Sequence, residues 1–518
     1  MATSCQPKRV LAASMVGYGS VALQTVLMLA LTPFVIRHIG TEAFGVWAVI
    51  NGLLAFATLL EAPSALAAIK YISRSHDSET PGASNRLVSN LLAAQLSLTG
   101  LLTAAVAVIT LAFPNLLSPD APHRATAQLI WIITGGAIAI NFPIGLAKSL
   151  LVGMGRQVEV QVFGIVGAVL NAVSVFCSLA GGGGLLSLAV ASAGSLLFPG
   201  LVAWLRVTRL VPGLRVSPRL CSRELLGELL GFGGASFVTN VAMTVVRRVD
   251  VLIMAGPLGL TATAVFQIAL RIADQAQMFL CQLANALTPA MGELFGSNDR
   301  ERRAAWFVRG SLASLALAAV PGLFLLVDAE RLLLWWVGPD FVAAAAPLRI
   351  LAVSLLVGCL EDHVGNVLAM GGRHRALAIC WIVIAATKIL ASVLLIPYLG
   401  IAAPAAGTLI GSIIGKVLME MPIGLRLMRV AVARYVRAVI VPVIPAAVAA
   451  VLVLAAMPTG GTRPALWQLV VRLAAASLAF AVTFAATGLP ADWRRSLAER
   501  IRRVVRVPRQ GGERVALN

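Results

Sequence analysis

The sequence predicts an all-α, polytopic membrane protein of about 14 transmembrane helices, built as two homologous six-helix lobes plus two C-terminal helices. Hydrophobic residues make up 59% of the chain and charged residues only 12%, and the mean hydropathy is +0.90. Because so few charges cannot cover the surface of a soluble protein, most of this surface must face lipid. An internal repeat and a bias of basic residues toward alternate loops are the other two observations behind the prediction.

The spans follow from apolar runs of about 20 residues, the length that crosses a bilayer core of about 30 Å as a helix. The first lobe has spans near residues 10–36, 43–69, 87–113, 127–151, 158–180 and 184–206. The second lobe has spans near 228–256, 261–290, 305–327, 343–370, 376–398 and 401–425, and two more follow near 436–457 and 465–488. The predicted domains are an N-terminal lobe at 1–210, a second lobe at 225–430, two additional transmembrane helices at 431–490 and a basic tail at 491–518.

The repeat relates glycine-containing segments of the two predicted lobes. Its aligned pairs are Gly40 with Gly259 at an offset of 219, and Gly155 with Gly372, Gly183 with Gly400 and Gly194 with Gly411 at an offset of 217. So constant a shift indicates two homologous bundles, and in a membrane protein a substrate path between them.

The basic residues are distributed unevenly between the two sides of the predicted membrane. Of 41 Lys and Arg, 30 lie at the N-terminus, in the even-to-odd loops and in the tail, and six lie in the opposite loops. Because basic loops resist translocation, we expect both termini in the cytoplasm of a bacterial inner membrane. The same distribution explains the net charge of +19 without nucleic acid as a partner. The tail is predicted either to lie along anionic inner-leaflet lipids or to be a solvated anchor.

Several functional classes lack their signatures in this chain. No loop between predicted spans exceeds about 25 residues, which leaves no soluble domain for an active site. No GxxxxGK[ST] motif is present, and the six cysteines and five histidines have no metal-ligand spacing. We therefore expect neither enzymatic activity, nor a cofactor, nor a metal site.

Four segments carry a resemblance to a known group. "IGTEAFGVWAVINGLLAFATLLEAPSALAAIKYISR", "DVLIMAGPLGLTATAVFQIALRI", "NVLAMGGRHRALAI" and "IPYLGIAAPAAGTLIGSIIGKV" resemble helices of bacterial polysaccharide-biosynthesis flippases, within the multidrug/oligosaccharidyl-lipid/polysaccharide exporter superfamily. The resemblance implies two lobes around a V-shaped cavity that opens alternately to either side. It also implies a polyprenyl-pyrophosphate-linked oligosaccharide as cargo, for O-antigen, capsule or exopolysaccharide synthesis. Membrane lipids, a coupling H⁺ or Na⁺, and a glycan polymerase or glycosyltransferase are the expected partners.

Two departures from the superfamily's patterns limit the choice of cargo. The segment Val16-Gly17-Tyr18-Gly19-Ser20 does not match the RxxGxxRD-type segment of the peptidoglycan-precursor branch, which argues against lipid II. Drug exporters of the superfamily usually have twelve helices, and this chain adds two. The alternatives are a cation-coupled multidrug exporter, which would use Glu61, Asp250 and Asp274, and a non-transporting membrane scaffold for glycan enzymes.

Charged residues inside the predicted spans are concentrated in the second lobe. Arg247, Arg271 and Lys388 lie nine or ten residues from the outer ends of their spans, which at 1.5 Å per residue is about 14 Å deep. The corresponding first-lobe positions are uncharged. The predicted head-group cavity is formed by the basic residues Arg247, Arg248, Arg271, Lys388 and Lys416. Arg suits a pyrophosphate through its planar fork, and Lys through a point charge.

The acids near these cations have two interpretations. Arg247 and Asp250 are three residues apart, as are Arg271 and Asp274, so each pair shares a helix face. The charges can therefore form a buried ion-pair network that holds helices together, or they can take part in ion coupling and substrate release. The acids predicted for coupling or ion pairing are Glu61, Asp250, Asp274, Glu361 and Asp362.

Overall fold

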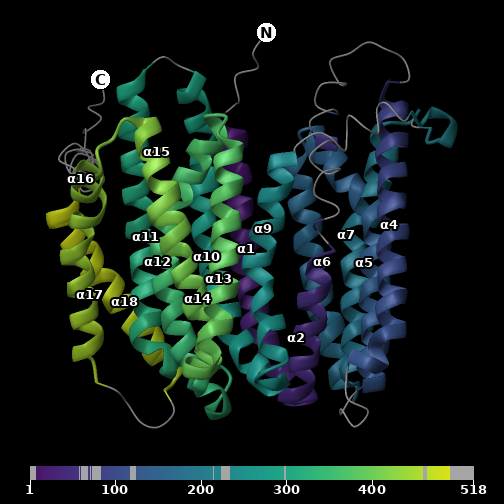
Figure 1. Ribbon diagram of the computed structural model, residues 1–518, viewed down its shortest axis with the longest axis horizontal. Helices are drawn as coiled ribbons and strands as arrows, with labels where there is room; N and C mark the ends of the chain where they lie inside the picture. The colour runs from purple at the N-terminus through teal and green to yellow at the C-terminus, as the bar shows by residue number, and fades with distance from the viewer. Residues whose placement is uncertain are drawn as a thin grey trace, which may run out of the picture.

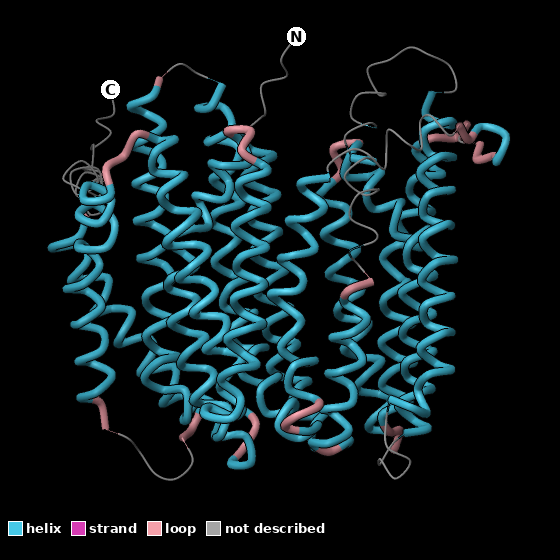
Figure 2. Tube along the Cα trace, in the orientation of Figure 1, coloured by secondary structure: helices cyan, strands magenta, loops and turns pink. Residues whose placement is uncertain are grey.

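The computed structural model is a bundle of long, roughly parallel helices (Figures 1 and 2). It describes residues 7–57, 83–116, 124–213, 215–222, 234–296, 299–458 and 464–489, together with residues 59, 68, 69 and 72. Within those residues the secondary structure is helical and no strand occurs. The predicted all-α class is therefore confirmed.

The first lobe contains six described helices: α1 (Pro7–Ile39), α2 (Thr41–Ala55), α4 (Ala83–Leu116), α5 (Arg124–Gly153), α6 (Gln157–Ala180) and α7 (Leu185–Leu210). The second lobe begins after η1 (Pro218–Leu220) and contains α9 (Gly234–Ala255), α10 (Gly259–Gly296), α11 (Arg300–Trp336), η2 (Pro339–Ala344), α12 (Ala345–Met370), α13 (His374–Leu399), η3 (Gly400–Ala402), α14 (Ala403–Gly411), the π-helix η4 (Ser412–Glu420) and α15 (Met421–Met428). The additional helices are α16 (Val432–Tyr435), η5 (Val436–Ile440), η6 (Val441–Val443), α17 (Ile444–Ala456), α18 (Leu466–Thr483) and η7 (Phe484–Gly488).

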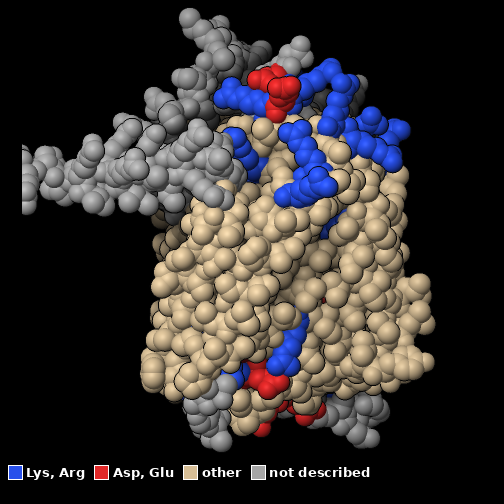
Figure 3. All heavy atoms as spheres, turned by 90° about the vertical axis from the view of Figure 1, so that its left-hand side faces the viewer, with Lys and Arg blue, Asp and Glu red and all other residues tan. Residues whose placement is uncertain are grey.

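Each predicted span coincides with a helix or a chain of helices in the described residues. Among the residues that the structure describes, ten stretches are long and apolar enough to cross a membrane, and the last span of the second lobe is merged with α13 into one of them. Three helices fall outside this set: α2, which has 15 described residues, and α9 and α10, which carry the intramembrane charges. Figure 3 shows most of the basic side chains of one face gathered at one end of the bundle, above a mainly uncharged band, with a smaller group of basic and acidic side chains at the other end. A band of this kind is expected of a surface that faces lipid.

The backbone repeats at the positions that the sequence repeat aligns. Gly40 and Gly259 have φ of +85° and +80°, and Gly155 and Gly372 have φ of +75° and +71°. This region of conformational space favours glycine because it has no Cβ. Each pair therefore makes the same sharp turn before the helix that follows.

A third turn has its positive φ one residue away from the aligned position. Gly400 has φ of +52°, and in the first lobe Gly182, the residue before the aligned Gly183, has φ of +82°. The run of four consecutive glycines gives the sequence no means of choosing between the two.

Helix packing repeats as well. In the first lobe α1 packs against α6 and α5 against α7, and in the second lobe α9 packs against α13 and α12 against α14 and η4. The two lobes therefore share one internal architecture, as the fold prediction required.

The largest apolar cluster joins the two lobes toward one end of the bundle. It combines Phe44 and Trp131 of the first lobe with Phe266 and Trp336 of the second. Two other clusters do not join the lobes: one connects the second lobe to α17 and α18, and the other lies within the first lobe. We call the joined end, where α2 and α10 begin, the closed end.

The closed end brings two backbones into direct contact. A Cβ added to Gly45 of α2 would lie 2.3 Å from the carbonyl oxygen of Leu260 in α10. Trp336 Nε1 of α11 also donates a hydrogen bond to the Leu29 carbonyl of α1, at 2.7 Å. The lobes thus pack here as tightly as helices within one lobe.

A buried ion pair fastens the additional helices to the second lobe. Arg472 of α18 contacts Asp328 of α11 at 3.0 Å, and Asp328 also pairs with Arg331. Arg472 donates further hydrogen bonds to the Leu454 and Met457 carbonyls of the α17 end, at 2.5 and 2.9 Å. Asp328 interrupts the regular helical dihedrals of α11, with φ −103° and ψ 17°.

Candidate functional site

Helix α10 separates two cavities. Arg271 and Gln275, one turn apart, line a cavity between the lobes. Asp274 and Gln277, on the other side of the same helix, line a cavity inside the second lobe. Successive residues turn by roughly 100° around a helix axis, so Arg271 and Gln275 lie on one face of α10 and Asp274 and Gln277 lie together on another. Helix α10 therefore presents a different polar pair to each cavity. We call the two spaces the interlobe cavity and the second-lobe cavity.

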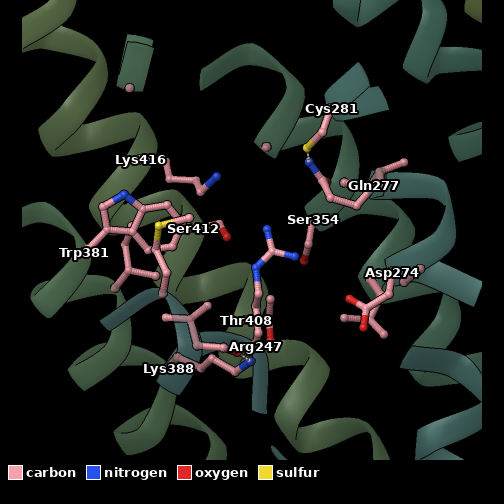
Figure 4. Close-up of a pocket in the computed structure, with 18 of the residues that line it drawn as sticks. Arg247, Asp274, Gln277, Cys281, Ser354, Trp381, Lys388, Thr408, Ser412 and Lys416 are labelled. Atoms are coloured by element: carbon pink, nitrogen blue, oxygen red, sulfur yellow. Dashed lines mark hydrogen bonds between the residues drawn. The ribbon is translucent and has the colours of Figure 1, made fainter. Parts of the chain in front are cut away.

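The second-lobe cavity has a volume of about 430 Å³ and is enclosed by α9, α10, α12, α13, α14 and η4. Arg247 of α9 reaches into its centre, with Ser354 and Asp274 to one side and Ser412 to the other (Figure 4). The Arg247 side chain is exposed to this space. A cation aimed into a hollow lined by hydroxyl groups is suited to a polar, anionic ligand.

Lys388 closes the wall of this cavity in a buried ion pair. Its Nζ lies 2.8 Å from Asp250 Oδ2 and also donates to the carbonyl of Val246. The side chains of Lys388 and Asp250 are 2% and 0% exposed. Asp250 thus pairs across to α13 instead of with Arg247 on its own helix, because Lys388 faces it directly. For these two residues the structure shows the ion-pair arrangement that joins helices.

Lys416 approaches the cavity from the π-helix η4. Its Nζ lies 5.2 Å from the centroid of the Trp381 ring on α13, within the range of a cation–π interaction. Ser412 lies one turn earlier and lines the same cavity. A π-helix widens the turn and is frequent at functional sites. Here it places Ser412 and Lys416 together on the cavity wall.

The interlobe cavity has a volume of about 310 Å³ and is lined by α1, α2, α6, α7 and α10. Arg271 Nη1 donates a hydrogen bond to Thr32 Oγ1 of α1, at 3.1 Å, and the guanidinium carbon lies 5.0 Å from the centroid of the Phe44 ring. Thr25 of α1 donates to Gln275 Oε1, also at 3.1 Å. The uncharged side chains here come mostly from the first lobe, and the charge comes from the second.

The predicted site residues therefore do not share one cavity. Arg247, Lys388 and Lys416 line the second-lobe cavity, Arg271 lines the interlobe cavity, and Arg248 lines neither. Glu61 lies outside the described residues. The side chains of Glu361 and Asp362 lie outside them as well. Asp274 lies within electrostatic range of four cations, Arg248, Arg247, Lys388 and Arg271, which links the two cavities through α10.

The sequence reasoning missed the uncharged polar residues of both cavities. In the second-lobe cavity these are Thr239, Gln277, Ser354, Asn366, Thr408 and Ser412. In the interlobe cavity they are Gln24, Thr32, Asn171, Ser192 and Gln275. The sequence could have indicated them, because they are amide and hydroxyl side chains inside strongly apolar runs. A buried polar group needs a hydrogen-bond partner or a water-filled space.

Both cavities carry an excess of positive charge among their described lining residues. Lys388 is neutralised by Asp250, so the second-lobe cavity has Arg247 and Lys416 against Asp274, and the interlobe cavity has Arg271 and no acid. Guanidinium groups bind phosphate oxygens through paired, charge-assisted hydrogen bonds, and amides and hydroxyls can bind sugar hydroxyls. The arrangement can therefore hold an anionic, hydroxyl-rich group below the membrane surface.

Comparison with known proteins identifies the architecture. Residues 235–394 match the family model described as MatE. A multidrug resistance MATE family transporter of the MOP superfamily, in an inward-facing conformation, is similar with a TM-score of 0.67 and 18% identity, over 80% of this chain and 98% of that one. This chain has a MATE-like fold.

Two further structures extend the MATE-like likeness. The MATE multidrug transporter DinF-BH has a TM-score of 0.61 and 15% identity, over 83% of this chain and 98% of that one. The lipid II flippase MurJ, in an inward closed conformation, has a TM-score of 0.67 and 11% identity, over 95% of this chain and 98% of that one. Because the MurJ comparison covers 95% of this chain, the similarity includes the two additional helices. No curated protein matches the chain.

Proposed function

We propose that this protein is a transporter of the bacterial inner membrane that flips a polyprenyl-pyrophosphate-linked oligosaccharide for O-antigen, capsule or exopolysaccharide synthesis. The observation that carries the proposal is the cationic, hydroxyl-lined character of the two cavities on either side of α10. A pyrophosphate and its sugars need a polar path through about 30 Å of hydrocarbon, while the prenyl tail can stay in lipid.

The movement is a rocking of residues 1–210 against residues 225–430. The large apolar cluster at the closed end and the polar contacts Arg271–Thr32 and Thr25–Gln275 join the lobes, so these are the contacts that must break for the lobes to reverse. With both termini in the cytoplasm, the closed end is periplasmic and the structure is inward-facing.

In this mechanism Arg271 and Arg247 bind the head group in turn. Arg271 donates a hydrogen bond to the Thr32 hydroxyl while the closed end is sealed. When cargo enters, the guanidinium donates to a phosphate oxygen instead. Asp274, which faces Arg247 across the second-lobe cavity, competes with the anion and prevents it from being held too tightly. The same carboxylate is positioned to take up a coupling H⁺ or Na⁺.

The test is transport of a labelled lipid-linked oligosaccharide in proteoliposomes, with and without ion gradients. Replacing both residues (Arg247→Gln and Arg271→Gln) removes charge-assisted hydrogen bonds worth about 1.5–3 kcal/mol each, so we expect transport to fall at least 10-fold. A matched control replaces two exposed arginines of α16 and η5 (Arg434→Gln and Arg437→Gln), which line neither cavity. Equal transport by both double variants would favour a membrane scaffold for glycan enzymes.

A second candidate is a cation-coupled exporter of small drugs. The specific observation in its favour is the similarity to MATE multidrug transporters, including DinF-BH. It predicts that loss of the gene raises drug sensitivity and leaves surface glycan intact. The cationic lining argues for anionic cargo instead.

A further inference from the structure

Five arginines surround a pocket that is separate from both transport cavities. The pocket has a volume of about 590 Å³, and its basic lining residues are Arg300, Arg303, Arg373, Arg426 and Arg429. They come from the start of α11, the turn before α13 and the end of α15. Figure 3 shows most of the basic side chains of one face gathered at this end of the bundle, where α11 and α13 begin. We call this space the arginine pocket.

The positive charge of the arginine pocket is not balanced by its lining. None of the described lining residues is acidic. Arg300, Arg373, Arg426 and Arg429 form no ion pair with an acid in the part of the chain that the structure describes. Like charges around one hollow repel each other, and an anion in the hollow relieves that repulsion. Asp299 and Glu301 adjoin Arg300 at the start of α11 but do not line the pocket.

Local helix energetics do not account for three of these arginines. Arg300 and Arg303 lie in the first turn of α11, and Arg373 immediately precedes α13. Helix N-termini carry partial positive charge and favour acids, so a cation there is unfavourable unless something else stabilises it. At α11 the capping is supplied by Asp299, whose side chain accepts from the Arg302 N–H, so the arginines are not needed for capping and contribute their charge to the pocket.

The internal repeat supplies a natural comparison. In the first lobe Arg156, the counterpart of Arg373, pairs with Glu159, and Glu159 also accepts from Arg206 Nε at 2.9 Å. That ion-paired cluster joins α6 to α7, and Glu159 offsets one of its two positive charges. The first-lobe counterpart of Arg373 is therefore ion-paired.

The second lobe lacks the same two partners. At the offset of 217 that relates Arg156 to Arg373, Glu159 corresponds to Ala376 and Arg206 to Ile423. Ile423 lines the arginine pocket, and Arg373 has no carboxylate at the position that corresponds to Glu159. The first lobe therefore has an ion-paired cluster at this position, and the second lobe has a cationic pocket.

The lining also has an apolar side. Ile423, Leu427 and Met428 lie in the wall beside the arginines. A pocket that combines guanidinium groups with aliphatic side chains fits an amphiphile, whose phosphates meet the charges and whose glycerol and acyl groups meet the carbon surface. Basic pockets between transmembrane helices on the cytoplasmic side bind multiply charged lipid head groups in this way.

We propose that the arginine pocket is a binding site for a phosphate-bearing anion, filled by the head group of an anionic phospholipid with two phosphates, such as cardiolipin. Binding ties α11, α13 and α15 together at this end of the second lobe. Its effect is to stabilise the second lobe as one unit without entering the transport path.

The test uses the full chain purified in detergent, with cardiolipin, phosphatidylcholine or inorganic pyrophosphate added. The readouts are the thermal midpoint and the lipid bound in native mass spectrometry. One variant removes two pocket charges (Arg373→Gln and Arg426→Gln), and a second restores the first-lobe carboxylate (Ala376→Glu). The matched control, Arg434→Gln with Arg437→Gln, removes two exposed charges that do not line the pocket.

We expect cardiolipin, and not phosphatidylcholine, to raise the thermal midpoint of the wild type and of the control. Removing two pocket arginines should weaken the apparent affinity about 30-fold, and Ala376→Glu should weaken it in the same direction. A pocket-dependent shift with pyrophosphate alone would assign the same phosphate site to a soluble anion. No shift with either anion, or equal shifts in pocket and control variants, would overturn the proposal.

Discussion

Replacing Lys388 should destabilise the second lobe strongly, and replacing its partner at the same time should restore most of the loss. Lys388 and Asp250 are 2% and 0% exposed, and the pair joins α13 to α9. Lys388→Met leaves the carboxylate buried without its cation, and Asp250 Oδ1 already has no hydrogen-bond partner in the described structure. Removal of one partner from a buried pair costs about 3–5 kcal/mol, while an apolar replacement of both is often nearly neutral.

The assay is a double-mutant cycle on the thermal midpoint in detergent. For a unit the size of one lobe, 3–5 kcal/mol corresponds to a fall of roughly 6–20 °C in either single variant. We expect the double variant, Lys388→Met with Asp250→Leu, to recover most of this fall, which measures the coupling between the two side chains. If the double variant is as unstable as the sum of the single ones, the pair does not hold α9 to α13 and the reasoning is refuted.

Two further predictions concern the contacts that fix the helices in place. Arg472→Met should lower the thermal midpoint and expose α18 to protease, because Asp328 keeps only Arg331 and loses charged hydrogen bonds from Arg472 worth about 1.5–3 kcal/mol. An unchanged cleavage pattern would contradict the role of the pair. Gly45→Ala should separate α2 from α10, because its Cβ would lie 2.3 Å from the Leu260 carbonyl oxygen. Spin-label distances across the closed end should lengthen in that variant and stay unchanged in Gly52→Ala, whose Cβ would have ordinary contacts of at least 3.4 Å.

The fold was predictable because lipid imposes a simple rule on the sequence. Apolar runs of helical length mark the spans, since a helix alone satisfies its own backbone in hydrocarbon. The glycine pairs Gly40 with Gly259 and Gly155 with Gly372 mark the repeat, because their backbone angles exclude most other residues. Helix ends were less predictable: the last span of the second lobe contains the π-helix η4, whose hydrogen bonding has no distinct sequence pattern.

The cavities were predictable only in part, because a sequence shows which helix carries a charge and not which neighbour it faces. Arg247 and Asp250 are correctly placed on one helix, yet the carboxylate finds Lys388, 138 residues away. Arg271 and Asp274 are equally close in sequence and line different cavities. Helix rotation within the bundle decides these partners, and rotation depends on packing contacts with several other helices at once.

The contrast between the two kinds of polar contact indicates what must change during transport. The Lys388–Asp250 pair lies within the second lobe, so rigid rocking of the lobes leaves it intact. The hydrogen bond from Arg271 to Thr32 crosses between lobes, so the same motion must break it. A guanidinium that loses its acceptor in a low-dielectric space costs free energy unless an anion replaces the acceptor. Under the proposed function, arrival of the head group and opening of the closed end are therefore coupled through Arg271, and empty reversal of the lobes is disfavoured.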